Sequence, residues 1–389
     1  MAKSKVYYTD MHVTGERNLL QKLEALMKKA GFENIDFKEK FVAVKVHFGE
    51  PGNLAYLRAN YAKVVCDYVK KLGGKPFVTD CNTLYIGGRK NALDHLDSAY
   101  TNGYNPFTTG VHTIIADGLK GTEERLVPVE GGEYVKEAKI GSAIMDADII
   151  ISLNHFKGHE LTGFGGALKN LGMGCGSRAG KMEMHSAGKP QVEQEYCVGC
   201  GKCQRICAHD APIITNGKAT IDHNKCVGCG RCIGVCPKDA VMAAFDEAND
   251  VLNYKIAEYT KAVIQNRPNF HINMVVDVSP FCDCHAENDV AIVPDVGMFV
   301  SFDPVAVDKA CADAVNKQPT VAGSILEKHG HSHNDHFKDV SPETNWISAL
   351  EHGEKIGIGT MDYELEKLTN QNLYSIENIN LTLYSPVFI

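Results

Sequence analysis

The chain has 389 residues, of which 44% are hydrophobic and 23% are charged, and its formal net charge is −8. These values are ordinary for a globular protein, and the length suggests two or three domains. The acidic balance argues against nucleic acid or an anionic membrane surface as a partner.

The N-terminal stretch "MAKSKVYYTD" lacks the apolar core of a signal peptide, and no run approaches the roughly 18 apolar residues of a membrane span. We therefore expect a cytoplasmic protein without membrane insertion. In that reducing compartment the 14 cysteines are expected to form metal or redox sites rather than disulfides.

The first half of the chain alternates predicted strands and helices. Apolar residues at helical spacing predict helices over 56–74 and 88–103. Short apolar runs predict strands over 41–49, 75–82, 111–118 and 147–154. This order is typical of an α/β sheet with helices on both faces.

Three loops after these strands carry reactive side chains. The apolar strand residues 41–46 lead to His47, residues 76–79 end at Asp80 and Cys81, and residues 147–153 open into a glycine-rich loop, 154–185. Loops beyond the carboxyl ends of strands form the ligand sites of open α/β sheets. The alternative to a ligand site is that 154–185 is a mobile loop whose polar side chains face the solvent. The side chains of interest in the long loop are His155, Lys157, His159, Lys169, Asn170, Cys175 and His185.

Two later segments repeat one cysteine pattern. "CVGCGKCQRICAHDA" (197–211) and "CVGCGRCIGVCPKDA" (226–240) both read C-x2-C-x2-C-x3-C, the run of bacterial two-cluster ferredoxins. One tight loop reaches three irons of a cubane, and the fourth cysteine of each run serves the other cluster. Between the runs, Asn216–Gly217 predicts a β-hairpin.

This pattern predicts two [4Fe–4S] clusters, with two structural zinc knuckles as the alternative. The first cluster would be held by Cys197, Cys200, Cys203 and Cys236. The second would be held by Cys226, Cys229, Cys232 and Cys207.

After the repeat the α/β pattern resumes, with expected helices at 245–265 and 304–317 and strands at 270–279 and 297–302. We predict an α/β fold with a parallel or mixed sheet, formed by residues 1–187 and 246–389. A small α+β two-cluster ferredoxin-like module, 188–245, is expected to be inserted in it. The alternative is two α/β halves that flank the module.

The segment "CDCH" follows the strand at 270–279 and offers two soft ligands and one borderline ligand. We expect an additional metal site from Cys282, Cys284 and His285, completed by Cys175 or by a histidine of the loop 154–185, and sulfur ligands favour zinc or iron over magnesium. The alternative is one buried cysteine and one free thiol. We also predict that this segment, the loop 154–185 and Asp303 converge in one pocket that faces the nearer cluster.

The chain closely resembles the domain-of-unknown-function family 362 of cytoplasmic iron–sulfur proteins. The resemblance spans nearly the whole chain and rests on "NHFKGHELTGFGGALKNLGMGCGSRAGK", the double cysteine run and "CDCHAENDVAIVPDVGMFVSFDPVAVDKA". It implies an α/β domain with two [4Fe–4S] clusters but supplies no substrate. Asp303 and Asp308 are carried over as motif residues without a known role.

Three functions are compatible with this sequence. In an oxidoreductase, electrons would pass through the clusters to a small-molecule substrate, with His155, His159 or His185 as proton donors and Lys169 neutralising an anion. In an electron carrier, the α/β domain would dock a redox partner protein. In a maturation protein, Cys175, Cys282 and Cys284 would transfer a metal. No dinucleotide fingerprint supports a nicotinamide cofactor, whereas a flavin stays open.

Overall fold

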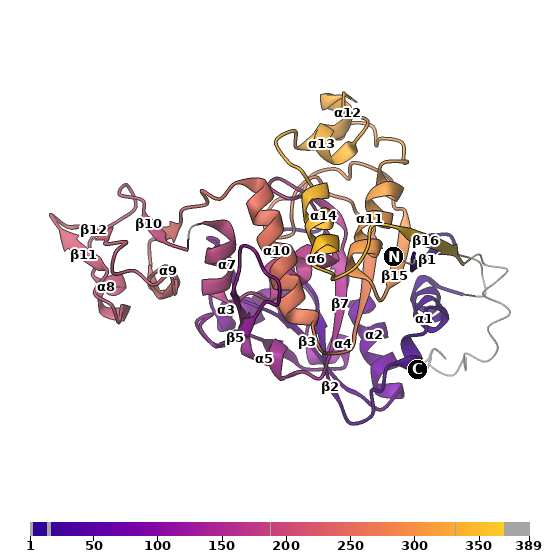
Figure 1. The fold of residues 1–389 in the computed structure, drawn as a ribbon. Coiled ribbons are helices and arrows are strands. Elements are labelled where there is room, and N and C mark those ends of the chain that lie inside the picture. The colour runs from indigo at the N-terminus through magenta and orange to yellow at the C-terminus, as the bar shows by residue number, and fades with distance from the viewer. Residues whose placement is uncertain (1–2, 14–16, 187, 331, 369–389) are drawn as a thin grey trace, which may run out of the picture.

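The computed structural model describes residues 3–13, 17–186, 188–330 and 332–368. At its centre lies an eight-stranded sheet with the order β16-β1-β15-β14-β7-β2-β3-β4 (Figure 1). Its strands are β1 Ser4–Thr9, β2 Phe41–Lys45, β3 Lys75–Asp80, β4 Thr113–Ile115, β7 Ile149–His155, β14 Asn269–Val275, β15 Gly297–Ser301 and β16 Tyr363–Lys367. Of these eight, β15 runs against the other seven. The predicted mixed α/β sheet is confirmed.

Helices cover both faces of this sheet because its central strands are apolar on both sides. All seven residues of β7 are buried, and the isoleucine-rich run is typical of a strand covered on both faces. Successive residues point to opposite faces, so Ile150 and Ile151 join different hydrophobic cores.

One core is formed with helices near the start of the chain, and the other with later helices that come from both sides of the cysteine repeat. The first face is covered by α1 Leu19–Lys29, α2 Ala59–Lys71 and α3 Ala92–Thr101. The second is covered by α6 Ala167–Cys175, α10 Asn249–Ile264, α11 Pro304–Val315 and α14 Ile347–Lys355. None of the helices in the described ranges is long and apolar enough to span a bilayer.

Strands from both sides of the cysteine repeat share the one sheet. β14, which follows the repeat, lies between β7 and β15, and its Met274 is in register with His155 of β7. The α/β chain therefore builds a single sheet from two separate stretches of sequence.

The long loop predicted over 154–185 is instead ordered secondary structure. It contains a hairpin of β8 Lys157–His159 and β9 Gly163–Gly165, followed by α6 and by α7 Arg178–His185. The prediction was wrong because the glycines serve close packing rather than chain flexibility. A side chain at Gly172 would place its Cβ 2.2 Å from the carbonyl oxygen of Ile256, so α6 packs directly on α10 there.

The cysteine-rich segment, residues 188–245, protrudes from one side of the sheet near α7 (Figure 1). Its first strand pairs antiparallel with its last, with Pro190 opposite Ala243. The hairpin predicted at Asn216–Gly217 is confirmed, and both turn residues have a positive φ, as a type I′ turn requires. The elements of the segment are β10 Pro190–Val192, α8 Lys202–Ile206, β11 Pro212–Thr215, β12 Lys218–Ile221, α9 Arg231–Val235 and β13 Val241–Ala243.

The remaining elements are short and lie outside the central sheet. They are η1 Phe32–Asn34, α4 Pro106–Thr109, β5 Glu124–Pro128, β6 Glu137–Gly141, α5 Ser142–Asp146, α12 Ile325–His329 and α13 His336–Val340. β5 and β6 pair antiparallel with each other.

Candidate functional site

A pocket lies beyond the carboxyl ends of β2, β3, β7 and β14. These four strands run in the same direction, so the segments that follow them meet at one edge of the sheet. The space free of protein atoms is about 570 Å³, part of it open to solvent, within the usual size of small-molecule sites. The charged and polar residues that line it include His47, Asp80, Tyr85, Arg89, His155, Lys157, Lys169, Lys181, Asp283 and Cys284.

Two buried ion pairs fix one wall of the pocket. The Lys45 ammonium lies 2.9 Å from Asp80 Oδ1, and Arg89 Nε lies 2.6 Å from Glu50 Oε2. Burial alone would raise the pKa of Asp80, but the nearby Lys45 ammonium holds it below its ordinary value. In each pair the cation and the carboxylate neutralise each other, and a buried pair of this kind is costly to break.

Cys282 is a fully buried cysteine whose surroundings favour the thiolate. Burial alone would raise its pKa, but a hydrogen bond from the Cys284 thiol and the ammonium groups of Lys157 and Lys169 hold it well below its ordinary value. Lys169 Nζ donates to the Cys282 sulfur at 3.3 Å, and the backbone N–H of Cys284 lies 3.4 Å from it. A stabilised thiolate is a nucleophile and a metal ligand.

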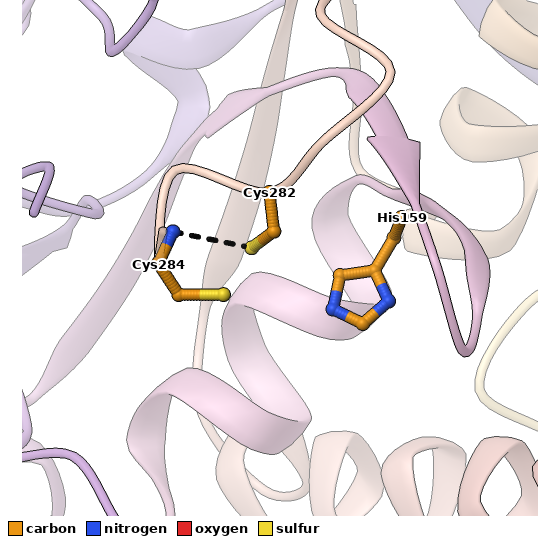
Figure 2. A group of neighbouring side chains, drawn as sticks. All are labelled: His159, Cys282 and Cys284. Carbon is orange, nitrogen blue, oxygen red and sulfur yellow. Dashed lines mark hydrogen bonds between the residues drawn. The ribbon is translucent and has the colours of Figure 1, made fainter. Parts of the chain in front are cut away.

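His159 faces the same two sulfurs. Figure 2 shows its ring turned toward Cys282 and Cys284, and one ligand atom from each of the three residues lies within 4.8 Å of the others. Its Nδ1 accepts the backbone N–H groups of Leu161 and Thr162 at 3.0 and 3.2 Å. The proton of the neutral ring is therefore on Nε2.

The two sulfurs and the imidazole nitrogen are ligands that a soft metal prefers. In this structure, however, a proton and an ammonium occupy the positions that a metal ion would take. A metal ion on Cys282 would have to displace the Lys169 ammonium from the same sulfur. An ion on His159 Nε2 would have to displace its proton, because Nδ1 is already an acceptor. A second group within 4.8 Å consists of Glu160, Cys284 and His285. The described geometry favours the thiolate–ammonium arrangement.

Cys175 lies away from both of these groups. Its carbonyl oxygen accepts the Cys81 thiol at 3.4 Å, and burial raises the pKa of the Cys175 thiol to about 11. Of the predicted metal set, only Cys175 is therefore separate, since Cys284 lies within 4.8 Å both of Cys282 and of His285. Cys282 and Cys284 lie together with His159, His285 pairs with Glu160 at 2.8 Å, and Cys175 is a buried thiol at the end of α6.

The other predicted histidines are hydrogen-bonded within the protein. His155 Nδ1 lies 2.9 Å from Asp283 Oδ1, and its Nε2 lies 2.8 Å from the carbonyl oxygen of Val276. Both nitrogens are engaged, so His155 positions Asp283 in this geometry. His185 Nε2 lies 2.8 Å from Tyr85 Oη, and burial lowers the pKa of His185 to about 3. The neutral ring of His185 therefore fixes the hydroxyl of Tyr85, and Tyr85 lines the pocket.

Asp303 does not line the pocket, contrary to the predicted convergence. It follows β15, the reversed strand, so it lies at the opposite edge of the sheet. Its Oδ1 accepts the N–H groups of Val305 and Ala306 and caps α11. Asp308 is also structural: it accepts the N–H groups that begin α6, and burial raises its pKa to about 6.

We expect Asp303→Ala to lower the free energy of unfolding by about 2–4 kcal/mol. The change removes a helix cap worth roughly 1 kcal/mol and two further hydrogen bonds of about 1 kcal/mol each, from Ser4 Oγ and the Thr360 N–H. Urea denaturation measures the loss. Asp303→Asn, which keeps one carbonyl oxygen, should lose less. Equal stability of Asp303→Ala and the wild type would contradict this structural role.

The eight cysteines of the repeat lie in two groups of four. Each group lines its own cavity, and the spaces free of protein atoms are about 340 and 330 Å³. The groups are those expected from the crossed pattern. Cys197, Cys200, Cys203 and Cys236 line the first cavity, and Cys207, Cys226, Cys229 and Cys232 line the second.

The second group lies on the side of the segment that packs against the α/β chain. Gly230, in its loop, is so close to α7 that a Cβ there would lie 2.8 Å from Arg178 and 3.5 Å from Met182. By contrast, Gly199 in the other loop packs on Gly217 of its own segment. We therefore call the group with Cys226 the inner group and the group with Cys197 the outer group.

Several residues of the pocket were not predicted as site residues from the sequence, namely Tyr85, Arg89, Lys181 and Asp283, and neither was Lys45, the buried partner of Asp80. One signal was available: Lys45 is the charged residue of the otherwise apolar strand "FVAVKV", and Asp80 ends the neighbouring strand. Tyr85 and Arg89 lie in an irregular segment between β3 and α3, where no periodicity marks a function.

Comparisons with known proteins agree with the predicted family. The family model described as "Domain of unknown function (DUF362)" matches residues 42–313. No curated protein matches. Two solved structures are similar: the lactate racemase apoprotein from Thermoanaerobacterium thermosaccharolyticum, 11% identical with a TM-score of 0.35, and a Thermotoga maritima protein from a structural genomics consortium, 14% identical with a TM-score of 0.38.

The likeness to these two structures is partial. They match 70% and 78% of this chain, and this chain spans 51% and 60% of theirs. The family match, in contrast, covers more than half of the chain without interruption. The chain therefore belongs to the domain of unknown function family DUF362.

Proposed function

We propose that this protein is an iron–sulfur oxidoreductase that passes electrons through two [4Fe–4S] clusters to a small molecule in the pocket. The observation that carries the proposal is the position of the two cysteine groups. Each contains four thiols around one cavity, and the inner group lies beside the helix that lines the pocket.

The donor sets fit the clusters. Each cavity offers four sulfurs, the number that a [4Fe–4S] cluster takes from cysteine. The backbone also supports bound sulfur, since the N–H of Ala219 lies 3.2 Å from Cys197 Sγ, and such hydrogen bonds tune cluster potentials. Bound clusters would supply one-electron transfer. The outer group would exchange electrons with a redox partner protein, since it lies farther from the α/β chain.

Two short stretches connect the inner group with the pocket. On α7, Lys181 lines the pocket while the next residue, Met182, packs in the small core with Cys232. After β3, Thr83 and Tyr85 line the pocket while Leu84 joins that same core. Adjacent residues thus belong to the pocket lining and to the core that contains cysteines of the repeat, which supports electron transfer between the two.

A metal-handling function is the second candidate, and the group of His159, Cys282 and Cys284 favours it. Zinc prefers cysteine and histidine ligands. This candidate predicts a bound metal in addition to iron, which Cys284→Ser would remove while the iron content stays unchanged.

The test is elemental and spectroscopic analysis of anaerobically purified protein. We expect about eight irons and eight sulfides per chain, as in other proteins with two such clusters, and paramagnetic resonance signals of reduced [4Fe–4S] clusters after dithionite. Two zinc ions per chain without sulfide would contradict the proposal and support zinc knuckles instead. Metal beyond iron that is lost in Cys284→Ser would support the second candidate.

A further inference from the structure

Lys157 is a buried lysine whose ammonium acts on the Cys282 thiolate and the Asp283 carboxylate through their charges without bonding to either. Its residue is only 5% exposed, and it lines the pocket. Within the described ranges, no hydrogen bond reaches its ammonium and no carboxylate lies within ion-pair distance. An ammonium that lines a pocket and has no hydrogen bond or ion pair of its own is suited to bind a ligand of opposite charge.

The backbone around Lys157 holds the ammonium in a fixed place. Lys157 in β8 is paired with Gly165 in β9, and a Cβ at Gly165 would lie 2.6 Å from the Lys157 Nζ. The lysine side chain therefore lies across a glycine, which leaves room for it. The next residue, Gly158, donates its N–H to the carbonyl oxygen of Ser279 at 2.8 Å, so the hairpin is anchored to the segment that leads to Cys282.

The charges around the pocket leave more than one cation without an anionic partner. Lys45 pairs with Asp80 and Arg89 with Glu50, while Lys169 lies on the Cys282 sulfur. A further cation, Lys181, donates to the carbonyl oxygen of Gly176.

We propose that Lys157 binds the carboxylate of a small organic monoanion in this pocket. A single negative charge would balance the ammonium of Lys157. A doubly charged phosphate would in addition meet the carboxylates of Asp80 and Asp283, which line the same pocket. That this anion is the substrate rests on the proposed oxidoreductase function, whereas the anion site itself does not.

The experiment is isothermal titration calorimetry of the cluster-containing protein with propionate and with inorganic phosphate, under anaerobic conditions. We expect saturable binding of propionate that weakens at least tenfold in Lys157→Met and stays within about threefold of the wild type in Lys157→Arg. Lys63→Met, on the surface of α2, is the matched control and should bind as the wild type does. We expect phosphate to bind at least tenfold more weakly than propionate.

Three results would overturn the proposal: no saturable propionate binding, equal binding by the wild type and Lys157→Met, or tighter binding of phosphate. If Lys157→Met does not fold, acetylation of the wild-type lysines mapped by mass spectrometry replaces it. Propionate must then protect Lys157 selectively, and unchanged labelling would refute the site. Because binding requires no electron transfer, the result is independent of the iron and sulfide analysis that tests the proposed function.

Discussion

Cys236→Ala is expected to lower the iron content from about eight to about four per chain, since each [4Fe–4S] cluster carries four irons. The cluster that disappears should be the one held by the other run. Cys236 belongs to the second cysteine run but lines the cavity of Cys197, Cys200 and Cys203. The reduced variant should show the paramagnetic resonance signal of one isolated cluster, whereas two neighbouring clusters give a broadened, interacting signal.

Cys207→Ala is the reciprocal variant and should remove the inner cluster instead. Because the inner group lies between the outer group and the pocket, this variant should still accept electrons at the outer cluster but fail to pass them on. Cys66→Ala is the control, since Cys66 is a fully buried thiol of α2 far from the repeat in the core of the α/β chain. A loss of the cluster of Cys226 in Cys236→Ala would show that the crossed ligand assignment is wrong.

The second large effect is expected at Cys282. In the wild type its modification by methyl methanethiosulfonate should depend little on pH between about 6 and 8, because a thiol with a low pKa is already ionised there. In Lys169→Met the ammonium that stabilises the thiolate is lost, so the pKa of Cys282 should rise. Its reaction rate should then fall about tenfold for each pH unit below the new pKa. Mass spectrometry of short, quenched reactions measures Cys282 separately from the other cysteines.

Lys181→Met is the matched control for this experiment. It removes a cation from the same pocket, but its ammonium is bonded to the Gly176 carbonyl and not to the Cys282 sulfur. Its profile against pH should therefore resemble that of the wild type. Identical profiles in Lys169→Met and the wild type would contradict a thiolate stabilised by Lys169. Protection of Cys282 by added zinc would instead favour the metal-handling candidate.

The sequence predicted the parts of this molecule that depend on local periodicity. The apolar run at 147–154 became the central strand β7, and Asn216–Gly217 became the predicted hairpin. The residues after β2, β3 and β7 did converge, because parallel strands bring their carboxyl ends to one edge. His47, Asp80 and Lys169 accordingly line the same pocket.

The sequence could not predict what depends on strand direction and on long-range contacts. Nothing local to "GMFVSF" indicates that β15 runs against its neighbours, and that reversal places Asp303 at the far edge. The partners of buried polar groups are equally distant in sequence. Asp283 and His155 are hydrogen-bonded although 128 positions separate them in the sequence, and Lys45 and Asn170 although 125 positions do. Their pairing therefore arises only when the sheet is assembled.

The pairing of β10 with β13 has a consequence for the history of the chain. Because Pro190 lies opposite Ala243, the polypeptide leaves the α/β sheet and returns to it at neighbouring points. A segment whose two ends lie side by side can be gained, lost or exchanged in evolution without moving any strand of the sheet. The source of electrons in the proposed function could therefore differ among relatives that share the same pocket.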